Sequence, residues 1–333
     1  MKKSRTFKMF SVRAAMLMFA AMFSAGAWAQ SSTHTFELIG PNAKGEFKAV
    51  IHGDRESDCG IGQNAAVTLY EIECQREFQV NVPATIVLPF PTTGLNVTGG
   101  NFYEFACVEW DSSASQWVAS MTSVAANNLQ RNTPYIVVPT ATNLTFGISE
   151  TKPSAYTDVA TVTCDCWAFV GTYKKTIWAD KSVDISDIVE KDYEMHQVAV
   201  GDYYGFAAKS GTEVGGSRTV SAGEFVKCSG DGTAANSAYI LPMRAYLQFV
   251  GDENCPANND TKMLTRQSGN NLPTSIAVVL RDANGEVTNV GAVSKETGEI
   301  TFEGWFTIDG IKLPAEPTKS GVYIHNGKKV VVK

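Results

Sequence analysis

The chain has few histidines and none of the familiar catalytic motifs. Its four histidines, His34, His52, His196 and His325, are scattered along 333 residues. The nucleophile motif G-x-S-x-G, the zinc motif H-E-x-x-H and the phosphate loop G-x-x-x-x-G-K-[ST] do not occur. These absences remove the sequence support for a serine hydrolase, for a zinc protease of that class and for a P-loop nucleotide-binding enzyme.

The chain also lacks an excess of basic residues and, beyond its N-terminus, a long apolar run. It carries 28 Lys and Arg against 34 Asp and Glu, for a formal net charge of −6. An acidic chain repels a phosphate backbone, so nucleic acid is not an expected partner. Crossing a bilayer takes roughly 20 apolar residues. No stretch after residue 29 offers them, and we expect no transmembrane segment in the mature chain.

The N-terminus has the pattern of an export signal. Five basic residues precede the apolar stretch 14–26, and the next three residues, ending at Ala29, match an A-x-A cleavage site. We predict a signal peptide over residues 1–29, cleaved between Ala29 and Gln30. Cleavage removes five positive charges and no negative one, which leaves 23 basic residues against 34 acidic ones and a formal net charge of −11. Because Gln30 is not a cysteine, a lipid anchor is not expected.

All seven cysteines lie in the predicted mature chain. Outside the cytosol, cysteines at such dispersed spacings indicate disulfides, and the odd count leaves at least one unpaired or intermolecular. A strand through residues 164–166 would place two sulfurs on one face, where they reach separate partners or hold a metal together. No second C-x-x-C accompanies them, so no metal site is predicted. The disulfide candidates are Cys59, Cys74, Cys107, Cys164, Cys166, Cys228 and Cys255.

Most of the chain has the composition of short β-strands. Segments rich in Val, Ile, Thr, Tyr and Phe are separated by Gly, Pro, Asn and Ser clusters, which is typical of a sandwich or barrel. Only residues 184–193 suggest a helical turn. We predict an all-β fold, with an antiparallel β-sandwich over residues 30–266, single or split near residue 150, and a small C-terminal β-hairpin module over 272–333. The polar stretch 267–271 marks the boundary.

Two strands show which faces should be buried. In residues 243–249, alternation sets Leu247 on one face and Arg244 on the other. We expect Arg244 to satisfy a carboxylate or loop carbonyls rather than to bind a substrate. The strand that contains Trp167 and Phe169 is apolar on both sides, which predicts a central strand.

The strand 102–111 carries the only carboxylates that suggest catalysis. Uninterrupted alternation places Glu109 and Asp111 on the same face as Phe105, and Glu104 on the opposite face. A glycosidase needs two carboxylates roughly 5–10 Å apart. A solvated strand end accounts for Glu109 and Asp111 equally well, so no catalytic residue is assigned.

The C-terminal residues 305–333 resemble the sorting tails of type IX secretion cargo. The resemblance rests on an Asp-Gly step after a strand, a Gly-Val-Tyr strand, an Asn-Gly turn and a final basic and valine-rich strand. It departs at Ile311, where such tails usually carry Arg or Lys. It implies outer-membrane passage, with the export machinery as partner at both termini and an extracellular or outer-surface location on a Gram-negative bacterium. The residues that carry it are Asp309, Gly310, Gly321, Tyr323, Gly327, Lys328, Lys329 and Lys333.

A looser resemblance covers residues 78–313. Segments such as 82–90, 133–137, 169–173 and 204–207 resemble a β-rich region found just before such tails in large exported proteins of gut and rumen bacteria. Those modules have no assigned activity. The resemblance therefore implies a fold and a compartment but no chemistry.

Binding candidates come mainly from aromatic residues. If they lie exposed on one face or rim, five of them would offer stacking surfaces for sugar rings: Trp110, Trp117, Trp178, Tyr203 and Tyr204. Two oxygen-rich stretches, 180–192 and 252–260, are weak Ca²⁺ candidates because they lack the D-x-[DN]-x-[DN]-G pattern. We expect no cofactor, and predict a secreted or cell-surface, non-enzymatic structural or interaction protein. The alternative is a carbohydrate-binding module, and a cryptic hydrolase ranks third.

Overall fold

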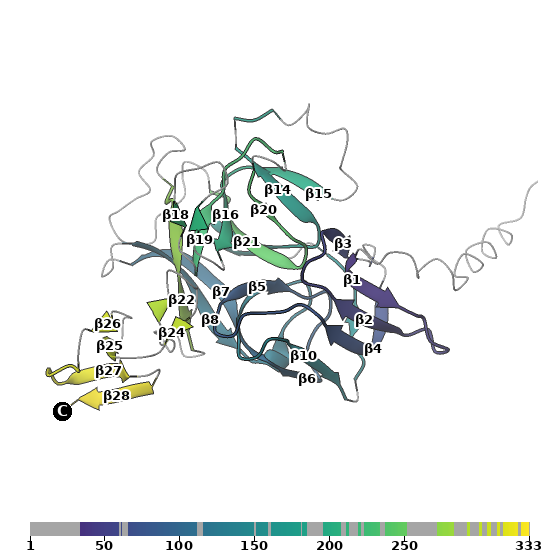
Figure 1. Ribbon diagram of the computed structural model, residues 1–333, viewed down its shortest axis with the longest axis horizontal. Helices are drawn as coiled ribbons and strands as arrows, with labels where there is room; N and C mark the ends of the chain where they lie inside the picture. Colours follow the sequence, from purple (N-terminus) through teal and green to yellow (C-terminus); the bar gives the residue numbers. More distant parts are fainter. Residues whose placement is uncertain are drawn as a thin grey trace, which may run out of the picture.

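β-Strands are the main regular secondary structure in the described part of the chain. The only helical turn in it is a 3₁₀ turn, η1 (Ala126–Asn128), and it contains no α-helix, which confirms the all-β prediction (Figure 1). The computed structural model describes residues 34–59, 61, 66–111, 116–149, 151–158, 161–180, 182–184, 196–207, 211–212, 219–220, 223–233, 237–251, 272–282, 292–293, 300–301, 305–307, 312–313, 316–325 and 328–332.

Two large sheets form the main body. The first has five strands in the order β11 (Ser154–Ala155), β4 (Val67–Cys74), β2 (Phe47–Ile51), β1 (His34–Ile39) and β3 (Ser57–Cys59). The second has ten strands in the order β12 (Thr161–Cys164), β13 (Trp167–Thr172), β21 (Arg244–Phe249), β16 (Tyr203–Ala207), β19 (Glu224–Lys227), β22 (Ser275–Arg281), β8 (Gln116–Val124), β7 (Gly100–Asp111), β9 (Pro134–Pro139) and β5 (Ala84–Val87).

Smaller sheets complete the described fold. One pairs β10 (Thr145–Ile148) with β6 (Leu95–Thr98), and a three-stranded sheet has the order β15 (His196–Val200), β14 (Lys175–Ala179), β20 (Tyr239–Ile240). Two-stranded pairs join β17 (Gly211–Thr212) to β18 (Thr219–Val220) and β23 (Ala292–Val293) to β24 (Ile300–Thr301). A four-stranded sheet has the order β26 (Lys312–Leu313), β25 (Trp305–Thr307), β27 (Gly321–His325), β28 (Lys328–Val332).

The sheets are mixed, which corrects the prediction of an antiparallel sandwich. Strands β2 and β4 run parallel, as do β1 and β3, β14 and β15, and β22 and β8. Parallel neighbours need connections that cross over other strands. Short strand-turn-strand patterns in the sequence indicate only hairpins, so these long-range parallel pairings were missed.

The ten-stranded sheet curls until its last strand, β5, meets its third, β21. The amide of Val87 donates to the carbonyl of Met243 at 3.3 Å, and the amide of Ala245 donates to Thr85 Oγ1 at 3.0 Å. The curled sheet encloses a core that includes Phe105, Met121, Ile136, Phe169, Tyr204, Phe225, Leu247 and Ile276. Closure in this way covers the edge of β5.

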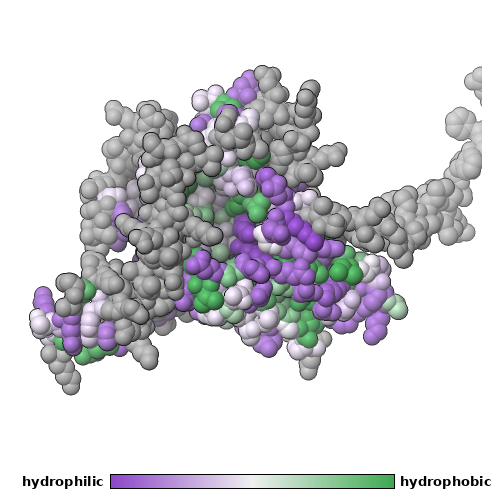
Figure 2. Space-filling view, in the orientation of Figure 1, coloured by the Kyte–Doolittle hydropathy of each residue, from purple (hydrophilic) through white to green (hydrophobic). Residues whose placement is uncertain are grey.

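The five-stranded sheet packs against the outside of β5 and β9 in a sandwich-like layer. Phe36, Ile51 and Leu69 from that sheet meet Ile86 and Val137 from the curled sheet in a second core. Hydrophilic residues predominate on the solvent face over β1–β4, with hydrophobic ones between them (Figure 2). Burial on one side and charge on the other explain the alternation in these strands.

A third core lies between the curled sheet and the three-stranded sheet. Ala168 and Val170 of β13 and Tyr246 of β21 pack there with Trp178 of β14. The other face of β13 points into the curled core, so all six of its residues are buried. The prediction of a central strand around Trp167 is therefore confirmed.

A bulge in β7 corrects the uninterrupted alternation expected there. The register with β8 shifts between Phe105 and Cys107, and as a result Phe105 and Val108 both enter the curled core. One extra residue in a strand reverses the side chains that follow it. Glu109 therefore lies on the face opposite Phe105, not on the same face.

The division of the chain into domains also differs from the expected one. Strand β22 lies beyond the expected boundary at residue 272, yet it pairs with β19 and β8 inside the curled sheet. Strands from both sides of residue 150 share that sheet, so the main body does not divide there. The separate C-terminal sheet begins at Trp305 and lies at one end of the molecule (Figure 1).

Candidate functional site

Two adjoining cavities open where β5, β16 and β21 meet. One has a volume of about 360 Å³ and the other about 450 Å³, and both are lined by Thr85, Phe206 and Arg244. We call the two together the arginine groove, because Arg76 lines the larger cavity and Arg244 both. Its walls come from segments far apart in the sequence, in part paired strands and in part the loop segment 76–83.

Arg76 is held just beyond the end of β4. Its Nη2 donates to the carbonyl of Thr85 at 3.0 Å and its Nη1 to that of Met243 at 3.5 Å, while its guanidinium carbon lies 4.4 Å from the centre of the Phe78 ring. A Cβ atom on Gly53 would come within 2.9 Å of Arg76 Cγ, so the absence of a side chain at residue 53 makes room for the arginine.

Arg244 begins β21 and reaches the same backbone segment. Its Nη2 donates to the carbonyl of Gly53 at 3.0 Å. Burial lowers the pKa of Arg244 to about 10, against a small opposing influence of the Cys74 thiol. The guanidinium therefore remains charged at neutral pH. The expectation that Arg244 satisfies loop carbonyls is confirmed at Gly53.

Neither groove arginine forms an ion pair with any residue that the structure describes. Their partners among the described residues are backbone carbonyls and a phenyl ring. By contrast, Lys227 at the edge of the groove lies 3.2 Å from the carboxylate of Asp202. The one acidic lining residue, Glu77, is exposed. The groove is thus a positively charged hollow in an acidic chain.

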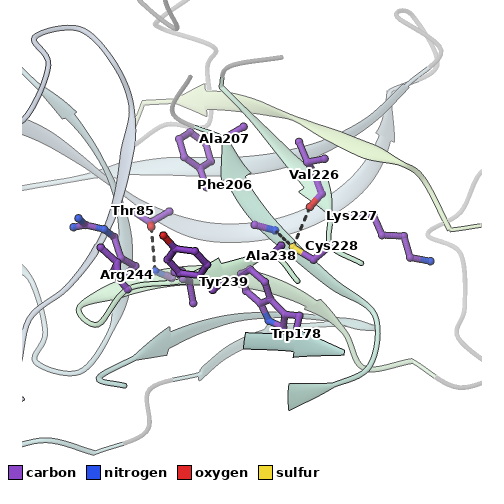
Figure 3. A pocket seen from close by; sticks show the side chains of 14 residues that line it. Thr85, Trp178, Phe206, Ala207, Val226, Lys227, Cys228, Ala238, Tyr239 and Arg244 are labelled. Carbon is purple, nitrogen blue, oxygen red and sulfur yellow. Dashed lines mark hydrogen bonds between the residues drawn. The ribbon is translucent and has the colours of Figure 1, made fainter. Parts of the chain in front are cut away.

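Aromatic rings form the opposite side of the smaller cavity. Figure 3 shows Tyr239 between Arg244 and Trp178, with Phe206 above. Tyr239 is 51% exposed, and Lys175 Nζ lies 4.6 Å from its ring centre. The indole Nε1 of Trp178 is buried and has no hydrogen-bond partner in the described structure. These rings offer flat apolar surface beside the cationic side chains of Arg244 and Lys175.

Cys228 lies in the wall of the same cavity. Its sulfur accepts a hydrogen bond from the amide of Gly205 at 3.1 Å and contacts the carbonyl of Val226 at 3.6 Å (Figure 3). Neither cavity has a histidine among its described lining residues, so the lining supplies no imidazole base for this thiol. The lining groups can hold a ligand by charge, hydrogen bonds and ring contacts.

The five predicted sugar-stacking residues are not brought together. Trp178 and Tyr203 stack in the third core, with ring centres 6.3 Å apart, and Tyr204 is fully buried in the curled core. Trp110 and Trp117 form a separate, partly exposed pair on the β7–β8 hairpin, with ring centres 5.6 Å apart. Only Trp178 lines the groove.

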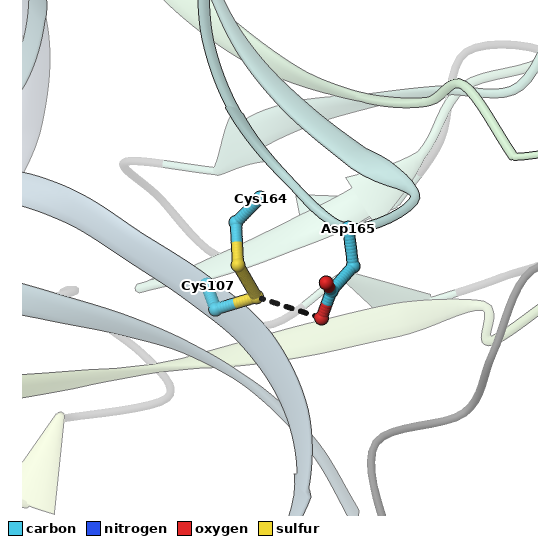
Figure 4. A group of neighbouring side chains, drawn as sticks. All are labelled: Cys107, Cys164 and Asp165. Carbon is cyan, nitrogen blue, oxygen red and sulfur yellow. Dashed lines mark hydrogen bonds between the residues drawn. A yellow bond between two sulfur atoms is a disulfide. The ribbon is translucent and has the colours of Figure 1, made fainter.

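The cysteines take two kinds of environment. Cys107 and Cys164 form a disulfide, with Asp165 Oδ2 3.8 Å from the Cys107 sulfur (Figure 4), and Cys166 is also disulfide-bonded. Asp165 and Cys166 form a two-residue hairpin turn with φ of 51° at Asp165, not the continuous strand that was expected. The thiols are Cys59, Cys74 and Cys228, and Cys255 lies outside the described residues.

The described acidic residues that were considered for catalysis or Ca²⁺ binding do not form a common site. Glu109 accepts a hydrogen bond from Ser120 at 2.5 Å and pairs with Arg281 at 3.1 Å, which gives it a structural role. Asp180 and Asp184 of the first oxygen-rich stretch are exposed, while residues 185–192 and 252–260 lie outside the described part. The described residues that gather as potential metal ligands are Cys107, Cys164 and Asp165, and their two sulfurs are bonded to each other.

The described part of the C-terminal tail is the four-stranded sheet of β25 to β28, and its last two strands form a hairpin. Strands β27 and β28 pair in antiparallel register, with Tyr323 opposite Val330, and the Tyr323 hydroxyl donates to the carbonyl of Lys319 at 2.9 Å. Gly321, Lys328 and Lys329 lie on these strands. The predicted signal peptide, the cleavage site at Ala29 and Gln30, and tail residues Asp309, Gly310, Gly327 and Lys333 lie outside the described residues. The described residues include no helix with the length and apolarity needed to cross a bilayer.

Sequence reasoning missed Arg76 and the joining of the two cavities. A lone arginine after a strand gives no signal of its own, and its contact with Met243 spans 167 residues. Comparison with known proteins adds no candidate: no family model, no curated protein and no solved structure matches this chain.

Proposed function

We propose that the protein is an exported, non-enzymatic interaction protein and that the arginine groove is its ligand site. The observation that supports the proposal is the junction of two cavities, of about 360 and 450 Å³, at Thr85, Phe206 and Arg244. Cavities of this size suit a small molecule or one segment of a polymer. The lining combines apolar rings with a few fixed donors, which is the usual composition of a binding site.

The proposal can be tested by filling the groove. Ala207 lines the smaller cavity, so Ala207→Trp should occupy part of it. Ala141 is exposed and lines neither cavity, and Ala141→Trp is the matched control. The mature protein and both variants would be screened for retention on soluble and insoluble polysaccharides and on peptide arrays. Retention that only Ala207→Trp loses supports the proposal, whereas retention equal in all three proteins contradicts it.

A carbohydrate-binding surface on the β7–β8 hairpin is the second candidate. The partly exposed pair of Trp110 and Trp117 is the observation in its favour, because paired indoles can present an apolar face to a sugar ring. Trp117→Ala should then abolish polysaccharide retention while Ala207→Trp leaves it unchanged. The reverse outcome assigns binding to the groove.

We also propose that the terminal strands β27 and β28 serve as an export address, as the resemblance to sorting tails implies. The described hairpin supports this proposal because it offers a small separate element with an exposed Val331. Deletion of residues 305–333 should retain the protein inside the cell envelope, as measured by fractionation of the native host. Unchanged surface or medium levels would contradict the address.

A further inference from the structure

The two groove arginines are unusual for their lack of a counter-charge. Burying an ion is costly unless an opposite charge or several hydrogen bonds compensate. Arg76 is 4% exposed, and its hydrogen bonds to described residues go to two neutral carbonyls. Within the described part of the chain, Arg244 has a single carbonyl partner. Each guanidinium has five N–H donors, so most of these donors have no protein acceptor in the described structure.

The arrangement of the two arginines is fixed by the fold. The carbonyl of Thr85 accepts a hydrogen bond from Arg76. The hydroxyl of Thr85 accepts one from the amide of Ala245 at 3.0 Å, and Ala245 directly follows Arg244. Gly53 packs against Arg76, and its carbonyl accepts a hydrogen bond from Arg244. Planar guanidinium forks fixed in this way match a carboxylate better than a flexible lysine would.

The neighbouring rings indicate what the rest of the ligand resembles. Tyr239 is half exposed and Phe206 lines both cavities, so apolar surface lies next to the charge. A sugar acid offers both complements, a carboxylate and a ring with an apolar C–H face.

A peptide fits the groove less well. Extended peptides bind chiefly by pairing with free backbone groups at a sheet edge. Here the backbone groups at the edge of β5 already have partners, because the amide of Val87 donates a hydrogen bond to Met243 and the carbonyl of Thr85 accepts one from Arg76. The amide of Gly205 on β16 bonds the sulfur of Cys228.

We propose that the arginine groove binds an acidic saccharide, with the carboxylate of a uronic acid toward Arg76 and Arg244 and the sugar ring against Tyr239. The inference rests on the proposed function of the groove and deepens it, because it names the ligand class. The bound carboxylate supplies the counter-charge that the described protein residues do not.

The direct test compares two ligands with the same sugar backbone, one with free carboxylates and one with neutral methyl esters. Trigalacturonate and its fully methyl-esterified form would be titrated into the mature full-length protein by calorimetry. We expect the ester to bind at least tenfold more weakly, and trigalacturonate affinity to fall as salt rises. Equal affinities would overturn the inference and leave the groove as a ligand site. Binding of neither saccharide, or of an acidic hexapeptide in their place, would also overturn it.

Variants locate the interaction. Arg244→Gln should lower trigalacturonate affinity at least tenfold, and Tyr239→Ala should lower the affinity for both saccharides. Arg131 is exposed and lies outside both cavities, so Arg131→Gln is the matched control and should bind as the parent does. If Arg244→Gln unfolds, Tyr239→Ala and Ala207→Trp still decide the site. Trigalacturonate binding that neither of these two variants weakens would overturn the inference.

Discussion

Gly53 supports both groove arginines, and Gly53→Ala is therefore a sharp test of the site. A Cβ atom at residue 53 would lie 2.9 Å from Arg76 Cγ and 3.1 Å from Arg76 Cα. Carbon atoms normally pack at about 3.5–4.0 Å. The Cγ atom belongs to a flexible side chain, but the Cα atom does not, so the backbone must move.

The expected cost follows from two opposing effects. Overpacking of this kind destabilises by about 1–3 kcal/mol. Replacing glycine also reduces the conformational entropy of the unfolded chain, which stabilises the folded protein by about 0.4–1 kcal/mol. We expect Gly53→Ala to lower the free energy of unfolding by about 1–2 kcal/mol, measured by urea denaturation, and to weaken binding in the groove.

A matched control separates sterics from chain entropy. A Cβ atom on Gly147 would lie 3.4 Å from Asn96 Cβ, which is ordinary contact. Gly147→Ala should therefore be neutral or stabilise by up to about 1 kcal/mol. If both variants shift the urea midpoint equally, the packing of Gly53 against Arg76 does not have the importance that we assign to it.

Three further predictions concern stability and chemistry. Leu247→Ala, in the curled core, should cost about 2–5 kcal/mol by urea denaturation, while exposed Val331→Ala should change stability by less than about 0.5 kcal/mol. Burial raises the pKa of Glu37, but hydrogen bonds from Arg55 and His52 outweigh it and lower that pKa below its usual 4.5. Its stabilising contribution is present above pH 4.5 and lost as pH falls through the lowered value, so Glu37→Gln should lose less stability between pH 6 and 3. Cys59 and Cys228 are buried and burial raises the pKa of Cys74 to about 11, so Ellman's reagent should label these thiols only after unfolding; rapid labelling of the native protein would contradict this.

Local pattern predicted the parts of the fold that local physics controls. The alternation in residues 243–249 correctly put Leu247 and Arg244 on opposite faces: Leu247 lies in the curled core, and Arg244 lines the groove. The apolar character of both sides of β13 correctly marked a central strand. In both cases alternate residues share a face of the strand, so a buried face appears in the sequence as an apolar residue at every second position.

Features that depend on one residue or on distant pairing escaped prediction. The bulge after Phe105 reversed the faces of β7, because a strand with apolar residues on both sides does not reveal an insertion. The two-residue turn at Asp165 lacks the glycine that usually marks such turns. The groove joins Arg76 and Arg244 through contacts 167 and 191 residues apart, and a single sequence carries no record of such contacts.

The position of β22 affects how the protein folds while it is being synthesised. This strand sits between β19 and β8 and is the last in the chain to join the curled sheet. Until synthesis reaches Arg281, β8 and β19 each lack a neighbour, and sheets that rely on such distant partners assemble slowly. A polypeptide that cannot complete its main sheet until residue 281 has been made remains incompletely folded through most of its synthesis, which suits the export that we predict from its N-terminal signal.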